Sequence, residues 1–140
     1  MADVIFLRFL ADMMNKVVDL EADTINLALV TTAYVPDQAD NQWDEVGGPE
    51  TNEASLGAGY TAGGAALADK VVTQADPTKW DNTADISWLA LTGAFRYGVI
   101  YDISAAKDLI CLFDFGAQSV TAANVTVIFN AAGIVTLTPP

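Results

Sequence analysis

The sequence contains no histidine, and this absence excludes several kinds of functional site. Serine triads, thiol–imidazole pairs, histidine acid–base catalysis and most zinc sites all need an imidazole. The single cysteine, Cys111, cannot form an intramolecular disulfide. It alternates with apolar residues in "DLICLFDF", a pattern that predicts a small buried side chain rather than a reactive thiol. We therefore expect no enzymatic activity, no cofactor and no metal.

Basic residues are also scarce, because 6 Lys and Arg stand against 18 Asp and Glu, giving a net charge of −12. Nucleic-acid binding needs a basic surface to displace counterions from phosphates, and anionic membranes need one as well. Long apolar runs are missing too, since Arg8 and Asp12 interrupt the N-terminal run well short of the ~20 residues of a spanning helix. We expect neither nucleic acid nor membrane as a partner.

What the sequence does contain is enough apolar material for one folded domain. The 140 residues, 52% of them hydrophobic, predict a single domain over residues 1–140 with a core of its own. At the N-terminus, apolar residues at helical spacing predict an α-helix over residues 3–18. One face of this helix carries Phe6, Phe9, Leu10, Met13 and Val17, and a second stripe carries Leu7, Met14 and Val18. The second stripe needs its own cover, either another subunit or the domain's own core.

After the helix the apolar pattern changes to a period of two, which is typical of strands. Short alternating segments separated by turn residues predict a mainly β fold, an antiparallel β-sandwich of jelly-roll or immunoglobulin-like type over residues 24–138. The segments are residues 24–32, 84–92, 94–103, 108–115, 124–129 and 133–138, with a further strand-like stretch near residues 66–73. Residues 34–57 are polar and acidic without a sustained period, so we expect one long exposed loop there.

The glycine-rich stretch "NEASLGAGYTAGG" invites comparison with phosphate-binding loops. The lysine of a P-loop is missing, and the spacing of Gly57, Gly59 and Gly63 is one residue too long for a dinucleotide fingerprint. No helix is expected to follow, so no helix N-terminus would meet an anion. We interpret the glycines as turn and bulge residues that allow positive φ or a close approach of two backbones.

Several motifs follow one another along the chain: an Asp-Thr-Ile strand with an "ALVT" core, a "GYTxGG" signature and a Gly-Ile ending. In this order, over roughly residues 16–138, they resemble a family of small structural proteins of tailed bacteriophages. The strand "GAFRYGVIYD" departs from the family pattern at Phe95 and Gly98. The matching residues are Asp23, Thr24, Ile25, Ala28, Leu29, Tyr34, Pro36, Asn52, Glu53, Gly59, Tyr60, Thr61, Gly63, Gly64, Leu67, Trp88, Arg96, Tyr97, Tyr101, Gly133 and Ile134.

The resemblance implies a virion structural protein. It points first to a capsid decoration (cement) protein that binds the outer surface of the phage head and stabilises neighbouring major-capsid subunits. The implied partners are the major capsid protein and copies of the chain itself, as a trimer or a dimer. The implied location is the exterior of the head, after synthesis in the host bacterial cytoplasm. The alternative is a tail- or fibre-associated protein that binds glycan.

For the interface we select the second helix stripe, Leu7, Met14 and Val18, together with Trp43 and Trp80, whose polar surroundings favour interface anchors. Three further hypotheses remain open. The acidic "DQADNQWDE" segment is a weak candidate for calcium, because its spacing does not match an EF-hand. The tryptophans could form a glycan platform, and a carboxylate pair could support glycoside hydrolysis, although no pair stands out.

Overall fold

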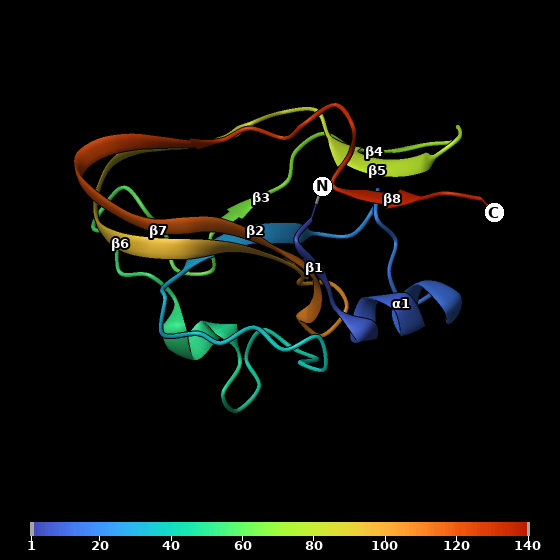
Figure 1. The fold of residues 1–140 in the computed structure, drawn as a ribbon, viewed down its shortest axis with the longest axis horizontal. Helices are drawn as coiled ribbons and strands as arrows, with labels where there is room; N and C mark the ends of the chain where they lie inside the picture. Colours follow the sequence, from blue (N-terminus) through green and yellow to red (C-terminus); the bar gives the residue numbers. More distant parts are fainter. Residues whose placement is uncertain (1, 140) are drawn as a thin grey trace.

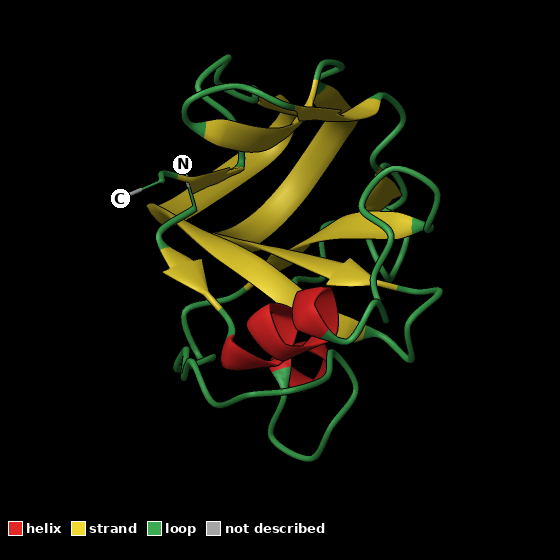
Figure 2. Ribbon diagram, turned by 90° about the vertical axis from the view of Figure 1, so that its right-hand side faces the viewer, coloured by secondary structure: helices red, strands yellow, loops and turns green. Residues whose placement is uncertain are grey.

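The computed structural model describes residues 2–139, which form two antiparallel sheets and one α-helix. The larger sheet has the strand order β1-β7-β6-β2-β3 and the smaller one the order β4-β5-β8 (Figures 1 and 2). The predicted mainly β fold with antiparallel sheets and an N-terminal helix is confirmed. The elements are β1 (Val4–Ile5), α1 (Leu7–Met14), β2 (Ile25–Val30), the 3₁₀ turn η1 (Pro49–Asn52), β3 (Ala65–Ala66), β4 (Lys70–Thr73), β5 (Thr78–Asn82), β6 (Ile86–Asp102), β7 (Asp108–Val127) and β8 (Val135–Leu137).

One long hairpin, β6 with β7, contributes to both layers of the molecule. The two strands run together, curl over at one end, and return above the sheet in which they began (Figure 1). At the curl the ladder shifts register, and Ala90, Gly93, Gly116 and Ala122 take positive φ. The segments expected as four separate strands are therefore two continuous ones. The turn signal at Gly93 marks a bulge that bends the strand, because bulges increase local twist without reversing the chain.

The larger sheet is buried on both faces, which explains why β2 alternates between two apolar clusters. Ile25, Leu27 and Leu29 point into the cluster between the two layers. Ala28 and Val30 point to the opposite face, into a second cluster that segment 34–57 supplies with Tyr34 and Trp43. Residues of this segment expected to be exposed thus cover a core, since an apolar sheet face must be kept from water.

The N-terminal helix is shorter than the expected range 3–18. Val4 and Ile5 pair with Leu112 and Cys111 on β7 as a short edge strand, a conformation that suits β-branched side chains. The helix ends in a Schellman motif: Lys16 has φ 57°, its N–H bonds the carbonyl of Met13, and the Val17 N–H bonds that of Asp12. The chain therefore leaves the helical path before Val18.

Candidate functional site

An exposed apolar face on α1 is the first candidate for an interaction surface. Leu7, Leu10 and Met14 are 54%, 39% and 86% exposed, and Val17, just beyond the helix, is 45% exposed. Leu7, Leu10 and Met14 lie within one narrow arc of the helix, and Val17 comes after the chain reversal at Lys16. We call these four residues the helix stripe. In Figure 2, α1 stands in front of the sheets with its outer side turned to the viewer.

An ionic network fixes which side of α1 faces the domain. Asp12 and Asp108 are 4% and 3% exposed, and the Arg8 guanidinium lies between them, with its Nη2 2.9 Å from Asp108 and its Nε 3.1 Å from Asp12. The Gln42 amide donates to the second oxygen of Asp108 at 3.1 Å. Burial raises the pKa of Asp12, and the Asp108 carboxylate raises the pKa of Arg8. The network therefore ties the helix, loop 34–57 and the β6–β7 turn together, and it turns Leu10 outward.

The helix residues selected from the sequence fall into two groups. Leu7 and Met14 are exposed, as an interface would require, whereas Val18 is half-buried and packs against the main core. Leu10 and Val17, which the spacing assigned to the home face, are exposed instead. Val17 is exposed because the chain reverses direction at Lys16. Leu10 is exposed because the ion pair of Arg8 with the buried Asp12 fixes the rotation of the helix about its own axis. An Arg-to-Asp pair at i, i+4 was the one available signal for this rotation.

Trp43 and Trp80 correct the expectation that indole rings lie at the surface. Trp43 is 1% exposed and stacks on the Tyr101 ring, with centroids 4.6 Å apart and planes inclined by 7°. Trp80 is 2% exposed, and its Nε1 donates to the carbonyl of Leu20 at 3.1 Å. The direct neighbours of Trp43 are half-buried or exposed, whereas Asp81 and Asn82 beside Trp80 are themselves buried and accept backbone N–H groups. Buried rings cannot form a glycan platform or anchor a partner in this fold.

Acidic side chains of loop 34–57 form hydrogen bonds within the loop and an ion pair with the turn between β6 and β7. Tyr34 donates to Asp40 at 2.5 Å, the Asn41 N–H donates to Glu45 at 2.7 Å, and Asp44 pairs with Lys107 at 2.8 Å. Within residues 2–139, no group of three or more acidic, cysteine or histidine side chains is arranged to hold a metal ion. The loop therefore covers the sheet, and its carboxylates accept hydrogen bonds from nearby groups of the loop or pair with Lys107.

The glycine-rich loop packs tightly on the sheet, as the turn interpretation predicts. Gly63 has φ 90°, its N–H donates to Glu53 at 2.6 Å, and its carbonyl accepts from Tyr101 at 2.8 Å and from Asn26 at 3.0 Å. Tyr60 donates to the same Glu53 carboxylate at 2.8 Å. A strand, β3, follows the glycines, so no helix N-terminus is present to hold a phosphate.

Two further titratable side chains lie in the interior. Cys111 is fully buried on β7, and burial raises the pKa of its thiol, which keeps it protonated and inaccessible. Asp102, at the end of β6, is 1% exposed; its Oδ1 accepts from the N–H groups of Ser104 and Ala105, and its Oδ2 has no donor. Burial, and then the nearby Asp23 carboxyl, raise the pKa of Asp102 to about 7.

The raised pKa of Asp102 predicts how stability depends on pH. The folded protein holds this proton up to about pH 7, whereas the unfolded chain releases it near its ordinary pKa of 3.8. The unfolded state therefore binds fewer protons in between, and the Asp102 contribution makes stability fall as the pH rises from about 4 to 7. Asp102→Asn is expected to flatten this fall and to raise the urea midpoint at pH 8.

The matched control for this measurement is Asp114→Asn on the neighbouring strand. Arg96 lowers the pKa of Asp114, so this carboxylate favours folding above its ordinary pKa and loses that effect as the pH falls. Its removal should leave the decline between pH 4 and 7 in place. Urea midpoints at four pH values separate the two cases, and an undiminished decline in Asp102→Asn contradicts the assignment.

No protein-family model matches the chain, and neither the search of curated proteins nor the search of solved structures found a significant match. The similarity to phage structural proteins thus remains a prediction from the motifs. In the described part of the chain, no helix combines the length and the apolar character needed to cross a bilayer.

Proposed function

We propose that this protein is a capsid decoration protein of a tailed bacteriophage, and that it docks on the outer surface of the head through the helix stripe. The observation that carries the proposal is the stripe itself. Leu7, Leu10, Met14 and Val17 are an apolar face on an acidic domain, and α1 is oriented by the ion pairs of the half-exposed Arg8 with the buried Asp12 and Asp108. Apolar faces that structure holds in contact with water are typical of protein interaction sites.

The charge of the chain supports a protein partner on the outside of a particle. A net charge of −12 repels packaged DNA and other acidic surfaces, and it favours docking beside basic groups of a shell protein. The stripe meets loop 34–57 at its start, where the Leu7 N–H donates to the carbonyl of Gln38 at 3.0 Å. The docking surface thus joins an apolar centre to an acidic border, the usual arrangement of a protein interface.

A stripe of four side chains gives only a small contact, so a single copy is expected to bind weakly. Stabilisation of a shell then arises because many copies bind at equivalent positions, and because a trimer or dimer engages several capsid subunits at once. Each copy would bridge neighbouring major-capsid subunits and resist their separation. A rigid domain with two apolar clusters is suited to this task, since it can transmit load without unfolding.

The double variant Leu10→Asp/Met14→Asp tests this docking surface. Both side chains are exposed, so the fold should persist, while two carboxylates replace the apolar centre of the interface. We expect co-sedimentation with heads that lack the protein to need at least tenfold more protein, on the order of 1.4 kcal/mol or more. Circular dichroism verifies that the variant is folded.

The control is Val35→Asp/Val46→Asp, which adds the same charge at two valines of loop 34–57 that are 81% and 106% exposed. Its binding should stay within about twofold of the wild type, because screening weakens distant charge effects. Equal binding by the helix variant and the wild type rejects the stripe as the docking surface. A copy number near that of the major capsid protein supports head decoration, and a few copies per particle contradict it.

A further inference from the structure

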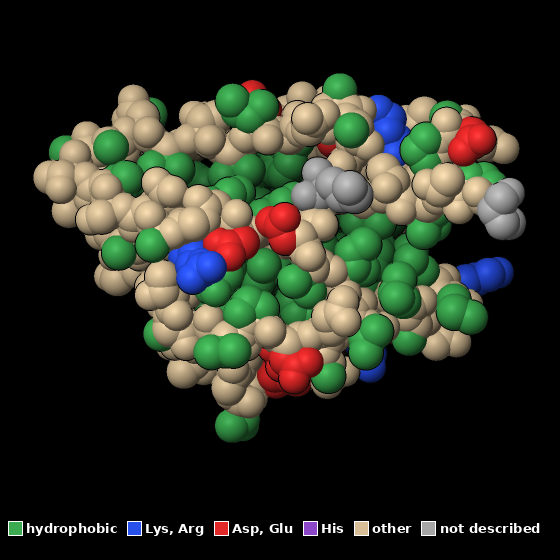
Figure 3. Space-filling view, in the orientation of Figure 1, with side chains coloured by type: hydrophobic (Ala, Val, Ile, Leu, Met, Phe, Trp, Pro, Cys, Tyr) green, Lys and Arg blue, Asp and Glu red, His purple; other side chains and the backbone are tan. Residues whose placement is uncertain are grey.

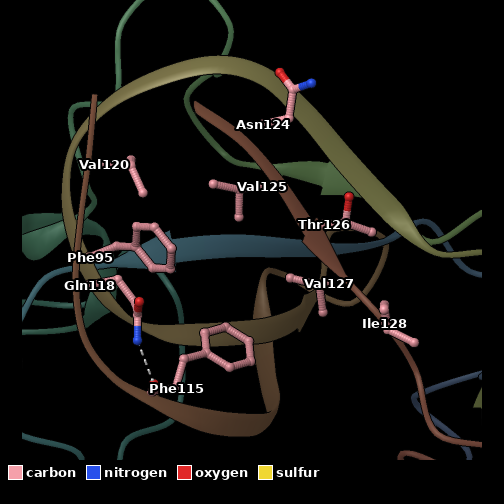
Figure 4. Close-up of a pocket in the computed structure, with 9 residues that line it drawn as sticks. All are labelled: Phe95, Phe115, Gln118, Val120, Asn124, Val125, Thr126, Val127 and Ile128. Carbon is pink, nitrogen blue, oxygen red and sulfur yellow. Dashed lines mark hydrogen bonds between the residues drawn. The ribbon is translucent and has the colours of Figure 1, made fainter. Parts of the chain in front are cut away.

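A second apolar surface lies away from α1, where β7 bends back over itself. We call the first and last parts of β7 its lower and upper limbs, and the opening between them the mouth. The surface is a groove of about 440 Å³ lined chiefly by Phe95, Phe115, Val120, Val125, Val127 and Ile128. Figure 4 shows Phe95, Phe115, Val120 and Val125 pointing into the space that the curl encloses. The lining contains no charged side chain. We call it the β7 groove.

The β7 groove opens at a free sheet edge. In the described chain, β1 pairs with β7 only at Cys111 and Leu112, and from Phe113 onward the pairing partner of β7 is β6 alone. The Asp3 carboxylate receives the N–H of Asp114 at 2.6 Å and so ends the β1 pairing. Beyond it, the Gly116 N–H and the Phe115 carbonyl bond the side chains of Asp114 and Gln118, and residues 117–127 of β7 then have no strand on the side away from β6. Such an edge is a template for an added strand.

The space-filling view shows the consequence at the surface. A hollow lined by hydrophobic side chains separates the upper and lower layers on the face turned to the viewer (Figure 3). Ile128, at the upper limb, is 74% exposed although it borders this hollow, and Phe115 lines the lower limb. A strand laid in the mouth would pair with β7 and bury these side chains at alternate positions.

The charge of the protein decides which kind of strand fits. The Asp3 carboxylate, which accepts the N–H of Asp114, stands beside the free edge of β7, whereas the exposed Asp85, which accepts the N–H of Phe129 at 3.3 Å, lies on the side of β7 that faces β6. In residues 2–139 neither carboxylate forms an ion pair, and the nearby Lys79 bonds the carbonyl of Ala131. The net charge of −12 opposes a second copy of this chain.

We infer that the β7 groove binds an extended segment of a different protein, with apolar residues at alternate positions and basic residues at its ends. The segment pairs with the free edge of β7 in the manner of an added strand. Its apolar side chains enter the groove, one basic end meets the Asp3 carboxylate, and both ends are attracted by the negative net charge of the domain. The inference does not depend on the docking of the helix stripe, because the two surfaces share no residue.

Binding of three synthetic peptides to the complete protein tests the inference. The first, acetyl-Lys-Val-Thr-Val-Thr-Val-Lys-amide, alternates apolar and polar residues between basic ends. The second replaces both lysines by glutamate, and the third replaces the central valine by proline, which removes a backbone donor. We expect the basic peptide to bind at least tenfold more tightly than either of the others, and to slow amide exchange in residues 113–127. Equal binding of all three peptides, or no binding of the first, overturns the inference.

Two variants with the same charge change locate the site. Ile128→Lys places an ammonium at the groove, whereas Leu89→Lys places one on β6, at a position that is 64% exposed and does not line the groove. Binding of the basic peptide should weaken at least tenfold in the first variant and less than twofold in the second. If both variants weaken peptide binding equally, the effect comes from the change in net charge, and the assignment of the binding site to the β7 groove is wrong. If the protein forms concentration-dependent dimers and Ile128→Lys abolishes them, the groove binds a second copy of this chain. That result also overturns the inference.

Discussion

Gly64→Ala is expected to lower the free energy of unfolding by about 2–5 kcal/mol, a large fraction of the stability of an ordinary domain. Gly64 has φ +78°, where a side chain is strained, and an added Cβ would lie 2.0 Å from the carbonyl oxygen of Leu27 and 2.6 Å from the Ala28 Cα. The obstruction is backbone of the central sheet, so the loop must move. Movement would disturb the bonds of Gly63 to Glu53 and Tyr101.

Gly57→Ala is the matched control, because Gly57 also has a positive φ but is not in close contact with the backbone of β2. Its φ is +84°, and an added Cβ would have nothing within 4 Å. The cost should be that of the left-handed conformation alone, about 1–2 kcal/mol. Urea denaturation of both variants separates close approach from backbone strain. Equal losses in the two variants would contradict the importance of the contact with β2.

Trp43→Ala is expected to cost about 3–5 kcal/mol, as for other fully buried aromatic side chains. The loss should exceed that of an isolated cavity, because Trp43 attaches loop 34–57 to the outer face of the larger sheet. Its ring stacks on Tyr101 and holds in place two backbone bonds of the loop, from the Trp43 backbone N–H to the carbonyl of Lys107 at 2.9 Å and from the Glu50 N–H to the Trp43 carbonyl. Chemical denaturation measures the stability, and amide exchange in residues 34–57 reports whether the loop is released.

Val46→Ala provides the comparison within the same loop. Val46 is fully exposed at 106%, so its truncation should change stability by less than about 0.5 kcal/mol and leave amide exchange in the loop unchanged. A Trp43→Ala variant that is as stable as Val46→Ala, with a protected loop, would show that the loop is held by its hydrogen bonds. It would also remove the argument that the indole is a core residue.

The sequence predicted the strands well where alternation is regular. β2 lies within the expected range 24–32, and β6 and β7 cover the expected alternating segments. Periodicity could not show that residues 84–92 and 94–103 are a single strand, because a bulge and a turn carry the same glycine signal. β5 was missed because "TKWDN" contains one apolar residue, Trp80, and the strand is held by its neighbours in the small sheet.

The candidate surfaces were predicted less well, and the reason is long-range packing. Leu7 and Met14 follow from helical spacing alone, and both are exposed. The outward position of Leu10 depends on the ion pair between Arg8 and Asp108, residues that are 100 positions apart in the chain. The burial of Trp43 depends on a distant sheet face that it covers together with Phe6 and Tyr34. Apart from the i, i+4 spacing of Arg8 and Asp12, neither relation leaves a local pattern for sequence reasoning to use.

The bent hairpin has a mechanical consequence for the mouth it encloses. In a sandwich of separate sheets, only side-chain packing sets the distance between the layers. Here a two-stranded ribbon passes from one layer to the other, and its curvature is concentrated near Gly93 and Gly116. The curl, and not side-chain packing alone, therefore sets the width of the mouth between the two halves of the hairpin.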